Sequence, residues 1–410
     1  MKRRTVLSVL GAGGVAAWAG TRYAFEHGLW NPCLGDSLPP HLADHELIQA
    51  AWQGIDPTQV WDCHAHIAGT GDSGSGIVVN PDMYELSHPI AYLKRKFYLN
   101  AGCVDENGEV DRGFIDRVLY LHAGFPVGTK LVLLALDFYH DSNGQIVEEN
   151  SFFYVPNAYL QSLAKQYPDA FEWIASIHPY REDALDELNK VHAAGARAIK
   201  WLPPAQGIDP SSPKCDAFYQ LMAGLGMPLL THTGAEHAVS VPGGHEYGNP
   251  LLLRRAMDHG VRVIAAHSAS IGENIDIDQG EKGAHVRSFD LFARLMNDKN
   301  YQSLLFGEIS ALMQRNRHPQ VVRALLEKQD WHDRLLNGSD YPLPAVLAIF
   351  SIQKFVRAGM LTEDAVEPLI ELHRYNPLLF DFVLKRTVNA DGNKFLPSVF
   401  HSRRILNAQA

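Results

Sequence analysis

Eight short apolar runs recur along this chain, and a polar loop and an amphipathic helical pattern follow most of them. Many of the runs are apolar almost without interruption, as parallel strands are when helices cover both faces of their sheet. The later runs end at intervals of roughly 30–40 residues, the size of one strand–helix unit. The predicted strands are residues 60–66, 131–136, 171–178, 196–202, 228–232, 262–267, 304–309 and 334–340.

Eight such units predict an α/β fold, a (β/α)8 barrel of the TIM type. The barrel is expected to occupy residues 55–385, and no linker indicates a second domain. Residues 67–130 are too many for one strand–helix connection, so we expect an insertion over the barrel mouth after the first strand. Extra helices are predicted after the last strand, and residues 386–410 are expected to form a C-terminal tail.

The amino terminus has the features of an export signal. A basic start containing the Arg3–Arg4 pair precedes a weakly apolar run over residues 6–20, which is shorter than the roughly 20 residues of a membrane-spanning helix. The arginine pair resembles a twin-arginine signal. We therefore expect residues 1–30 to be an export signal, cleaved or kept as an anchor, and the protein to lie in the bacterial periplasm or to face it from the membrane. The four cysteines could form a disulfide in an oxidising compartment, but their spacing does not indicate one.

The first strand carries the sequence's strongest chemical signal. Side chains alternate between the faces of a strand, so His64 and His66 are predicted to share one face with Asp62, while Cys63 and Ala65 face the covering helices. Two imidazoles on one face can bind a single metal ion. These two end the strand at the rim where barrel enzymes build their sites, which favours a metal role over that of ordinary polar residues.

Three later strands end in the same kind of residue. The strands of residues 228–232 and 262–267 stop at His232 and His267, and the last strand stops at Asp340. One such histidine is usually an ordinary polar residue, and one such aspartate usually forms a turn. All three, however, are predicted on the rim that carries His64 and His66. Their joint occurrence indicates a metal centre.

These motifs resemble those of a known family. The Asp-Cys-His-Ala-His segment of residues 62–66, the histidine-ended strands and the Gly-Ser-Asp-Tyr-Pro segment of residues 338–342 are similar to the metal-dependent amidohydrolase superfamily. The most similar branch is the amidohydrolase-related (amidohydrolase 2) group. Residues 195–203 also resemble the fourth strand of that group. That group includes lactonases, other hydrolases and metal-dependent decarboxylases. The resemblance covers roughly residues 60–380 and does not specify a substrate.

The resemblance implies a ligand set and a catalytic pair. His64, His66, His232 and Asp340 would hold one divalent metal ion, and His267 and Asp340 would be catalytic. Imidazole and carboxylate ligands suit Zn²⁺ best and Fe, Co or Mn less selectively. Such an ion lowers the pKa of a bound water to about 7. His267 would polarise the substrate carbonyl or stabilise its developing negative charge.

Three further residues could support the site. Lys200 is predicted to face the inner rim, because a lysine among covering helices would be costly. It could bind a substrate carboxylate or pair with an acid; if it is carboxylated, as in some members of the superfamily, it would bridge two metal ions. Glu308 could orient a ligand histidine or lie at the surface, and Asp62 could support the histidines from below.

We therefore expect a metal-dependent hydrolase that attacks a lactone, amide or ester of a small molecule with a metal-activated water. A nonoxidative decarboxylase of an aromatic or unsaturated acid is the alternative, and a non-catalytic exported barrel that binds metal or ligand is the second. The formal net charge of −10 argues against nucleic acid as a partner. Membrane contact is expected only through residues 1–30, and the sequence leaves the oligomeric state open.

Overall fold

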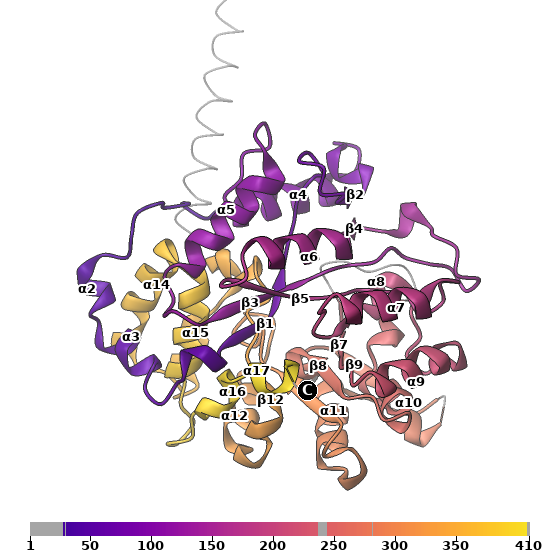
Figure 1. Cartoon of the computed structure of the whole chain (residues 1–410). Coiled ribbons are helices and arrows are strands. Elements are labelled where there is room, and N and C mark those ends of the chain that lie inside the picture. The colour runs from indigo at the N-terminus through magenta and orange to yellow at the C-terminus, as the bar shows by residue number, and fades with distance from the viewer. Residues whose placement is uncertain (1–27, 29, 237–243, 281, 408–410) are drawn as a thin grey trace, which may run out of the picture.

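A computed structural model describes residue 28 and residues 30–236, 244–280 and 282–407 (Figure 1). Residues 1–27 of the expected export segment lie outside this part of the chain. Among the residues described, no helix combines the length and the apolar character that crossing a membrane requires.

Each predicted strand run contains a parallel strand in the structure, in two sheets. A three-stranded sheet has the order β1-β3-β5, and a five-stranded sheet has the order β12-β11-β8-β7-β6. The strands are β1 (Trp61–His66), β3 (Lys130–Leu134), β5 (Phe171–Ile174), β6 (Ile199–Trp201), β7 (Leu229–His232), β8 (Val263–Ala266), β11 (Leu305–Glu308) and β12 (Leu335–Leu336).

Isolated bridges connect the two sheets at both edges. Ala175, just after β5, bridges Ile199 of β6, and Ala65 of β1 bridges Tyr341 beyond β12. At the second edge the Cys63 amide also donates to the Asn337 carbonyl at 3.0 Å. The eight strands therefore follow the order of the predicted barrel, and their ladders are interrupted at these two edges.

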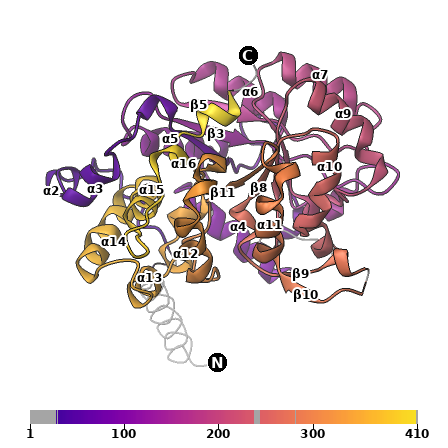
Figure 2. The same cartoon turned by 90° about the horizontal axis from the view of Figure 1, so that it is seen from below.

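Helices follow the strands and lie outside them (Figure 2). In α11 the buried side chains Phe289, Phe292 and Met296 recur at intervals of three and four, so one apolar stripe faces the strands. The helices between successive strands are α6 (Asn157–Gln166), α7 (Ala184–Ala193), α8 (Pro203–Gln206), α9 (Asp216–Gly224), α10 (Arg254–Asp258), α11 (Ser288–Asn297) and α12 (Pro319–Glu327). A short hairpin of β9 (Glu273–Ile275) and β10 (His285–Arg287) precedes α11.

Apolar side chains form two clusters, one on each face of the strands. The larger cluster joins the strands to the helices. The smaller one draws on the runs of all eight strands, so the strands enclose it, and the buried Ile405 and Leu406 of α17 (Arg403–Leu406) complete it. The end of the C-terminal segment therefore packs into the barrel core.

The predicted insertion is present between β1 and β3. It contains β2 (Val78–Val79), α4 (Pro89–Ala101) and α5 (Val110–His122), and β2 pairs with β4 (Phe153–Tyr154). These elements lie together at one end of the strands (Figure 1). A disulfide joins Cys33 to Cys103 just beyond α4, while Cys63 and Cys215 are free and buried. The disulfide ties the segment before the barrel to the insertion.

The helices after β12 pack beside the amino-terminal helices. Trp52, which follows α3, stacks on Phe382 of α15 with ring centroids 4.3 Å apart. The elements of these regions are α2 (Pro40–Ala43), α3 (Glu46–Ala51), α13 (Ile352–Arg357), α14 (Val366–Tyr375), α15 (Pro377–Thr387) and α16 (Pro397–Phe400).

Candidate metal centre

Three of the four expected ligands meet at the carboxyl ends of β1 and β12. The Nε2 atoms of His64 and His66 are 3.2 Å apart, and Asp340 Oδ1 lies 3.5 Å and 3.3 Å from them, respectively. All three ligand atoms lie within 4.8 Å of one another, so they could hold one metal ion. Two imidazole nitrogens and one carboxylate oxygen are a donor set suited to Zn²⁺ and neighbouring divalent metals.

An irregularity in β1 changes which side chains share a face. Its register with β3 shifts between Asp62 and Ala65, so strict alternation fails. Trp61 and Cys63 both belong to the inner apolar cluster, whereas Ala65 belongs to the helix-facing cluster. The prediction that Cys63 faces the helices is therefore wrong. The irregularity lets Cys63 point inward although His64 and His66 both reach the metal centre.

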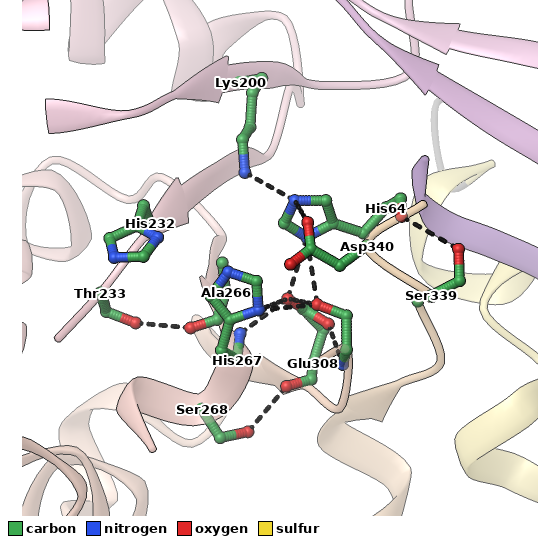
Figure 3. Close-up of polar contacts among 12 residues, drawn as sticks. His64, Lys200, His232, Thr233, Ala266, His267, Ser268, Glu308, Ser339 and Asp340 are labelled. Atoms are coloured by element: carbon green, nitrogen blue, oxygen red, sulfur yellow. Dashed lines mark hydrogen bonds and ion pairs between the residues drawn. The ribbon is translucent and has the colours of Figure 1, made fainter. Parts of the chain in front are cut away.

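Glu308 lies at the centre of the hydrogen bonds beneath the ligands (Figure 3). Its Oε1 is 3.0 Å from His64 Nδ1 and accepts from the His267 amide at 2.6 Å. Burial alone would raise the pKa of Glu308, but His64, His267 and the Ser310 amide outweigh it and hold the pKa below its ordinary value. The carboxylate is therefore charged. It accepts a hydrogen bond from His64 Nδ1. The Nε2 atom of His64 is then unprotonated, and its lone pair is directed at the other ligands.

His267 begins a strained turn after β8. His267, Ser268 and Ala269 have φ of 57°, 48° and 49°, in the left-handed region that such residues rarely adopt. The Ser268 hydroxyl holds this turn by donating to the Glu308 carbonyl at 3.0 Å. Ser310 Oγ lies 2.7 Å from His267 Nδ1 and donates to Glu308 Oε1 at 2.7 Å. Nδ1 of His267 therefore carries the proton, and its Nε2 is an acceptor.

His232 lies beside this group but is not one of the converging ligands. Its ring centroid is 5.2 Å from that of His267. Its Nε2 is 3.3 Å from the Ala235 carbonyl, and its Nδ1 is 3.3 Å from Glu236 Oε2. Figure 3 shows the ring apart from the dashed contacts around His64. Both nitrogens thus contact the loop after β7 instead of His64, His66 or Asp340.

Lys200 reaches the centre from β6. Its Nζ is 3.1 Å from His64 Nε2, and its side chain is buried. Burial lowers the pKa of Lys200 to about 8, against the opposing effect of Glu308 and Asp340. Burial also lowers the pKa of His64 to about 4 and that of His267 well below its ordinary value, so both imidazoles are neutral at pH 7.

Asp62 supports the ligands through the backbone. Its Oδ1 accepts from the Ser339 amide at 2.8 Å and the His64 amide at 3.2 Å, so one carboxylate holds both ligand-bearing segments. Gly338 makes this close approach possible, because a Cβ there would lie 2.7 Å from His64 Cβ. Behind this loop the buried Lys385 donates to the Gly338 carbonyl at 2.5 Å.

The ligands open into a cavity of about 200 Å³. Tyr98 of α4, in the predicted insertion, lines it, and so does Phe153 of β4. Leu134, Leu136 and Val155 add further apolar surface. A cavity of this size, lined largely by apolar groups with a few polar ones, is typical of a small-molecule site.

Several residues of the site were missed in the sequence. Ser310 lies two positions after Glu308, and that spacing at the end of a strand could have drawn attention to it. Gln314 and Arg317 line the cavity from a turn that resembles ordinary polar loop sequence, and no sequence signal distinguishes them. Lys385 lies four residues after Asp381 in a largely apolar helix, which is a weak signal of a buried ion pair.

Fold and site together define a class: an α/β protein with barrel strand order and a candidate metal centre at the carboxyl ends of its strands. The model of the amidohydrolase family matches residues 61–357. This chain belongs to the amidohydrolase family, whose fold is a TIM barrel and whose metal-dependent members include hydrolases and decarboxylases that act on small molecules. The predicted family and fold class are thereby confirmed.

Comparison with curated proteins gives no match. Solved structures show distant likenesses. A 5-carboxyvanillate decarboxylase from Sphingomonas paucimobilis has 9% identity and a TM-score of 0.48, over 85% of this chain and 98% of that one. A 4-oxalomesaconate hydratase from Rhodopseudomonas palustris has 14% identity and a TM-score of 0.43, over 85% and 95%. An uncharacterised TIM-barrel protein from Bordetella bronchiseptica has 16% identity and a TM-score of 0.44, over 69% and 86%. These likenesses are too distant to assign an activity.

Proposed function

We propose that this protein is a metal-dependent hydrolase of a carbonyl compound, a lactone, amide or ester of a small organic molecule. The observation that carries the proposal is the convergence of His64, His66 and Asp340 at one end of a cavity. These residues would hold one divalent ion, with Zn²⁺ the best match to their donors. Bound there, the ion would supply Lewis acidity and a water of lowered pKa.

The protein's own residues provide the proton transfers. Opposing its burial, the neighbouring histidines hold the pKa of Asp340 well below its ordinary value, so its carboxylate is charged and can accept a proton from the attacking water and then pass it to the leaving group. His267 is neutral, and its Nδ1 is occupied by Ser310, so its Nε2 is a proton acceptor. We therefore propose that His267 acts as a base. This differs from the expectation that it stabilises negative charge, which requires a proton on Nε2.

His232 and Lys200 have separate proposed roles. His232 would join the ligands only after its ring leaves Ala235 and Glu236, which it contacts in the structure. Lys200 lies against His64 and would place a positive charge beside the reacting group. Its carboxylation would instead support two metal ions. Metal content distinguishes these states, because the first requires one equivalent per chain and the second requires two.

We also propose that the protein is exported to an oxidising compartment, as its amino-terminal sequence indicates. The Cys33–Cys103 disulfide supports this, because disulfides persist outside the reducing cytoplasm. Fusion of residues 1–30 to a reporter that is active only after export would test the proposal. A reporter retained in the cytoplasm would contradict it, and replacement of both arginines by lysine provides the control.

Purified, metal-loaded protein tests the activity. Turnover on a panel of lactones, aryl esters and amides is expected and should disappear with chelation and return with Zn²⁺. His267→Asn should retain the metal and lose rate by about 100-fold or more. His318→Asn, which changes a histidine capping α12 away from the cavity, is the matched control. Release of CO₂ from a hydroxybenzoate panel without hydrolysis would contradict the proposal and favour decarboxylation.

A further inference from the structure

A groove separate from the cavity at the metal centre lies between the segment that follows β3 and the segment that follows β5. Its volume is about 880 Å³, which is in the range of small-molecule sites. Among the described residues none lines both spaces, although Asp137 and Tyr154 of the groove are chain neighbours of Leu136 and Val155 of the cavity. The groove is therefore a second place where a ligand could bind.

Contacts between its two walls hold this groove in shape. Gly144 approaches the opposite wall so closely that a Cβ there would lie 2.1 Å from the Tyr180 carbonyl oxygen. Arg181 Nη1 donates to Asp137 Oδ2 at 3.0 Å, and its Nε and Nη2 each donate to a carboxylate oxygen of Asp183 at 2.8 Å. Arg181 is the one lysine or arginine that lines the groove, and it is already paired with two carboxylates. An anionic ligand therefore finds no unpaired cation here.

His140 presents an acceptor without a partner to the groove. The residue is only 2% exposed, and its ring centroid lies 4.5 Å from that of His178. Burial lowers the pKa of His140, so the ring is neutral, and its Nδ1 donates to the Phe138 carbonyl at 3.1 Å. Within the described ranges no group donates to Nε2, and this atom keeps accessible surface where the ring lines the groove. A buried side chain with an unused acceptor indicates a missing donor.

The charges and rings of the groove favour a cation as the source of that donor. Glu182 and Asp186 are exposed carboxylates, and no cation of the described residues forms an ion pair with either. Four carboxylates in all line the groove against one guanidinium, so its potential is negative. Phe138 and Tyr154 line it as a stacked pair with ring centroids 4.0 Å apart, and aromatic faces attract cations.

A metal ion does not fit these groups. In the part of the chain that the structure describes, two sets of ligand atoms lie close enough together to hold an ion, and both belong to the metal centre. The acceptors of the groove are farther apart, as they would be around an organic molecule. The unused acceptor, the negative charge and the aromatic pair together define the ligand.

We propose that the groove binds a small organic cation that has N–H donors and an apolar or aromatic body. Its ammonium or guanidinium group would donate to His140 Nε2 and be attracted by the carboxylates of Glu182 and Asp186. Its apolar part would contact Phe138 and Tyr154. This site is separate from the proposed hydrolysis, and its ligand is not the substrate.

Calorimetric titration of the purified, metal-loaded protein with three probes tests the site. Benzylammonium carries both charge and N–H donors, benzyltrimethylammonium carries the charge without donors, and benzyl alcohol carries a donor without charge. Benzylammonium should bind at least about 10-fold more tightly than either of the others, because hydrogen bonds that involve a charged group are stronger than neutral ones.

Variants of the groove separate the two contributions. His140→Phe removes the acceptor and keeps a flat ring, so it should weaken benzylammonium binding by about 10-fold and leave benzyltrimethylammonium binding unchanged. The double variant Glu182→Gln/Asp186→Asn should weaken the binding of both cations by about 3- to 10-fold at low salt and leave benzyl alcohol binding unchanged. Asp169→Asn, an exposed carboxylate just before β5, is the matched control and should change no affinity.

The outcomes decide the proposal in either direction. Wild-type protein that binds the three probes equally, or binds none of them, would overturn it. A preference for benzylammonium that survives in both groove variants would also overturn it, because the probe would then bind elsewhere, as in the cavity at the metal centre. His140 is buried, so if His140→Phe does not fold, the exposed double variant decides, and unchanged affinities for both cations would overturn the proposal.

Discussion

Replacing Glu308 with glutamine tests how the metal centre is organised. Oε1 of Glu308 is 2.6 Å from the His267 amide, 2.7 Å from Ser310 Oγ and 3.0 Å from His64 Nδ1, and Oε2 is 2.5 Å from the Ser310 amide. In the glutamine variant an NH2 group replaces one of these two oxygens, and at either position it faces another hydrogen-bond donor. The less damaging orientation places the NH2 group at Oε2. One hydrogen bond is then lost, and the other three are made to a neutral oxygen.

The expected cost follows from these contacts. Loss of one charge-assisted hydrogen bond and weakening of the others should lower the free energy of unfolding by about 2–3 kcal/mol. His64 loses the carboxylate that fixes its tautomer and ring orientation. Loss of such a partner typically weakens metal binding by about 10- to 100-fold. Glu308→Gln should therefore affect both stability and metal affinity.

Two assays measure these effects separately. Competition with a chromophoric chelator gives the zinc affinity, and urea unfolding of the metal-free protein gives the stability. Glu273→Gln, at an exposed position of β9, is the control and should change neither quantity. A Glu308→Gln protein with wild-type zinc affinity and unchanged unfolding would refute the view that this carboxylate orients His64.

Three further predictions concern the scaffold. Gly338→Ala should lower both stability and zinc content, because its Cβ would lie 2.7 Å from His64 Cβ, whereas Gly224→Ala, with open space at its Cβ, should not. Cys33→Ser should lower the free energy of unfolding by about 4 kcal/mol in urea, since the disulfide closes a loop of 70 residues; an unchanged midpoint would contradict this. Burial lowers the pKa of His373 to about 4, below about 6.5 in the unfolded chain, so the unfolded state binds the proton first as pH falls. The stability that His373 contributes is therefore present above pH 6.5 and is lost toward pH 4. About 2 kcal/mol of it is lost between pH 7 and pH 5. His373→Gln should remove this part of the pH dependence of stability measured by urea unfolding.

Most of the fold could be predicted because parallel strands covered by helices have a characteristic sequence. A run such as residues 262–267 is apolar throughout, and the structure places β8 at Val263–Ala266 within it. The insertion could be predicted from its length alone. Its pairing of β2 with β4 could not, because two-residue strands carry no periodicity. The disulfide could not be predicted either, since it depends on how the segment before the barrel reaches the end of α4.

The candidate site was predictable only in part, for geometric reasons. Strand ends predicted the convergence of His64, His66 and Asp340, because carboxyl ends of parallel strands share one rim. The direction of Cys63 was mispredicted because an irregularity in β1 interrupts the alternation, and such irregularities leave little trace in a sequence. The approach of Gln314 and Arg317 to the cavity depends on a turn fixed by Lys354, 37 residues beyond Arg317 in the chain. Contacts of this kind are visible only after folding.

Metal content per chain tests the central claim most directly. Protein purified from its native host should contain one equivalent of a divalent metal. Asp340→Ala should abolish it while far-ultraviolet circular dichroism shows an intact fold. Wild-type protein without metal, or an Asp340→Ala protein that keeps its full equivalent, would contradict the account of His64, His66 and Asp340 as the ligands of one ion.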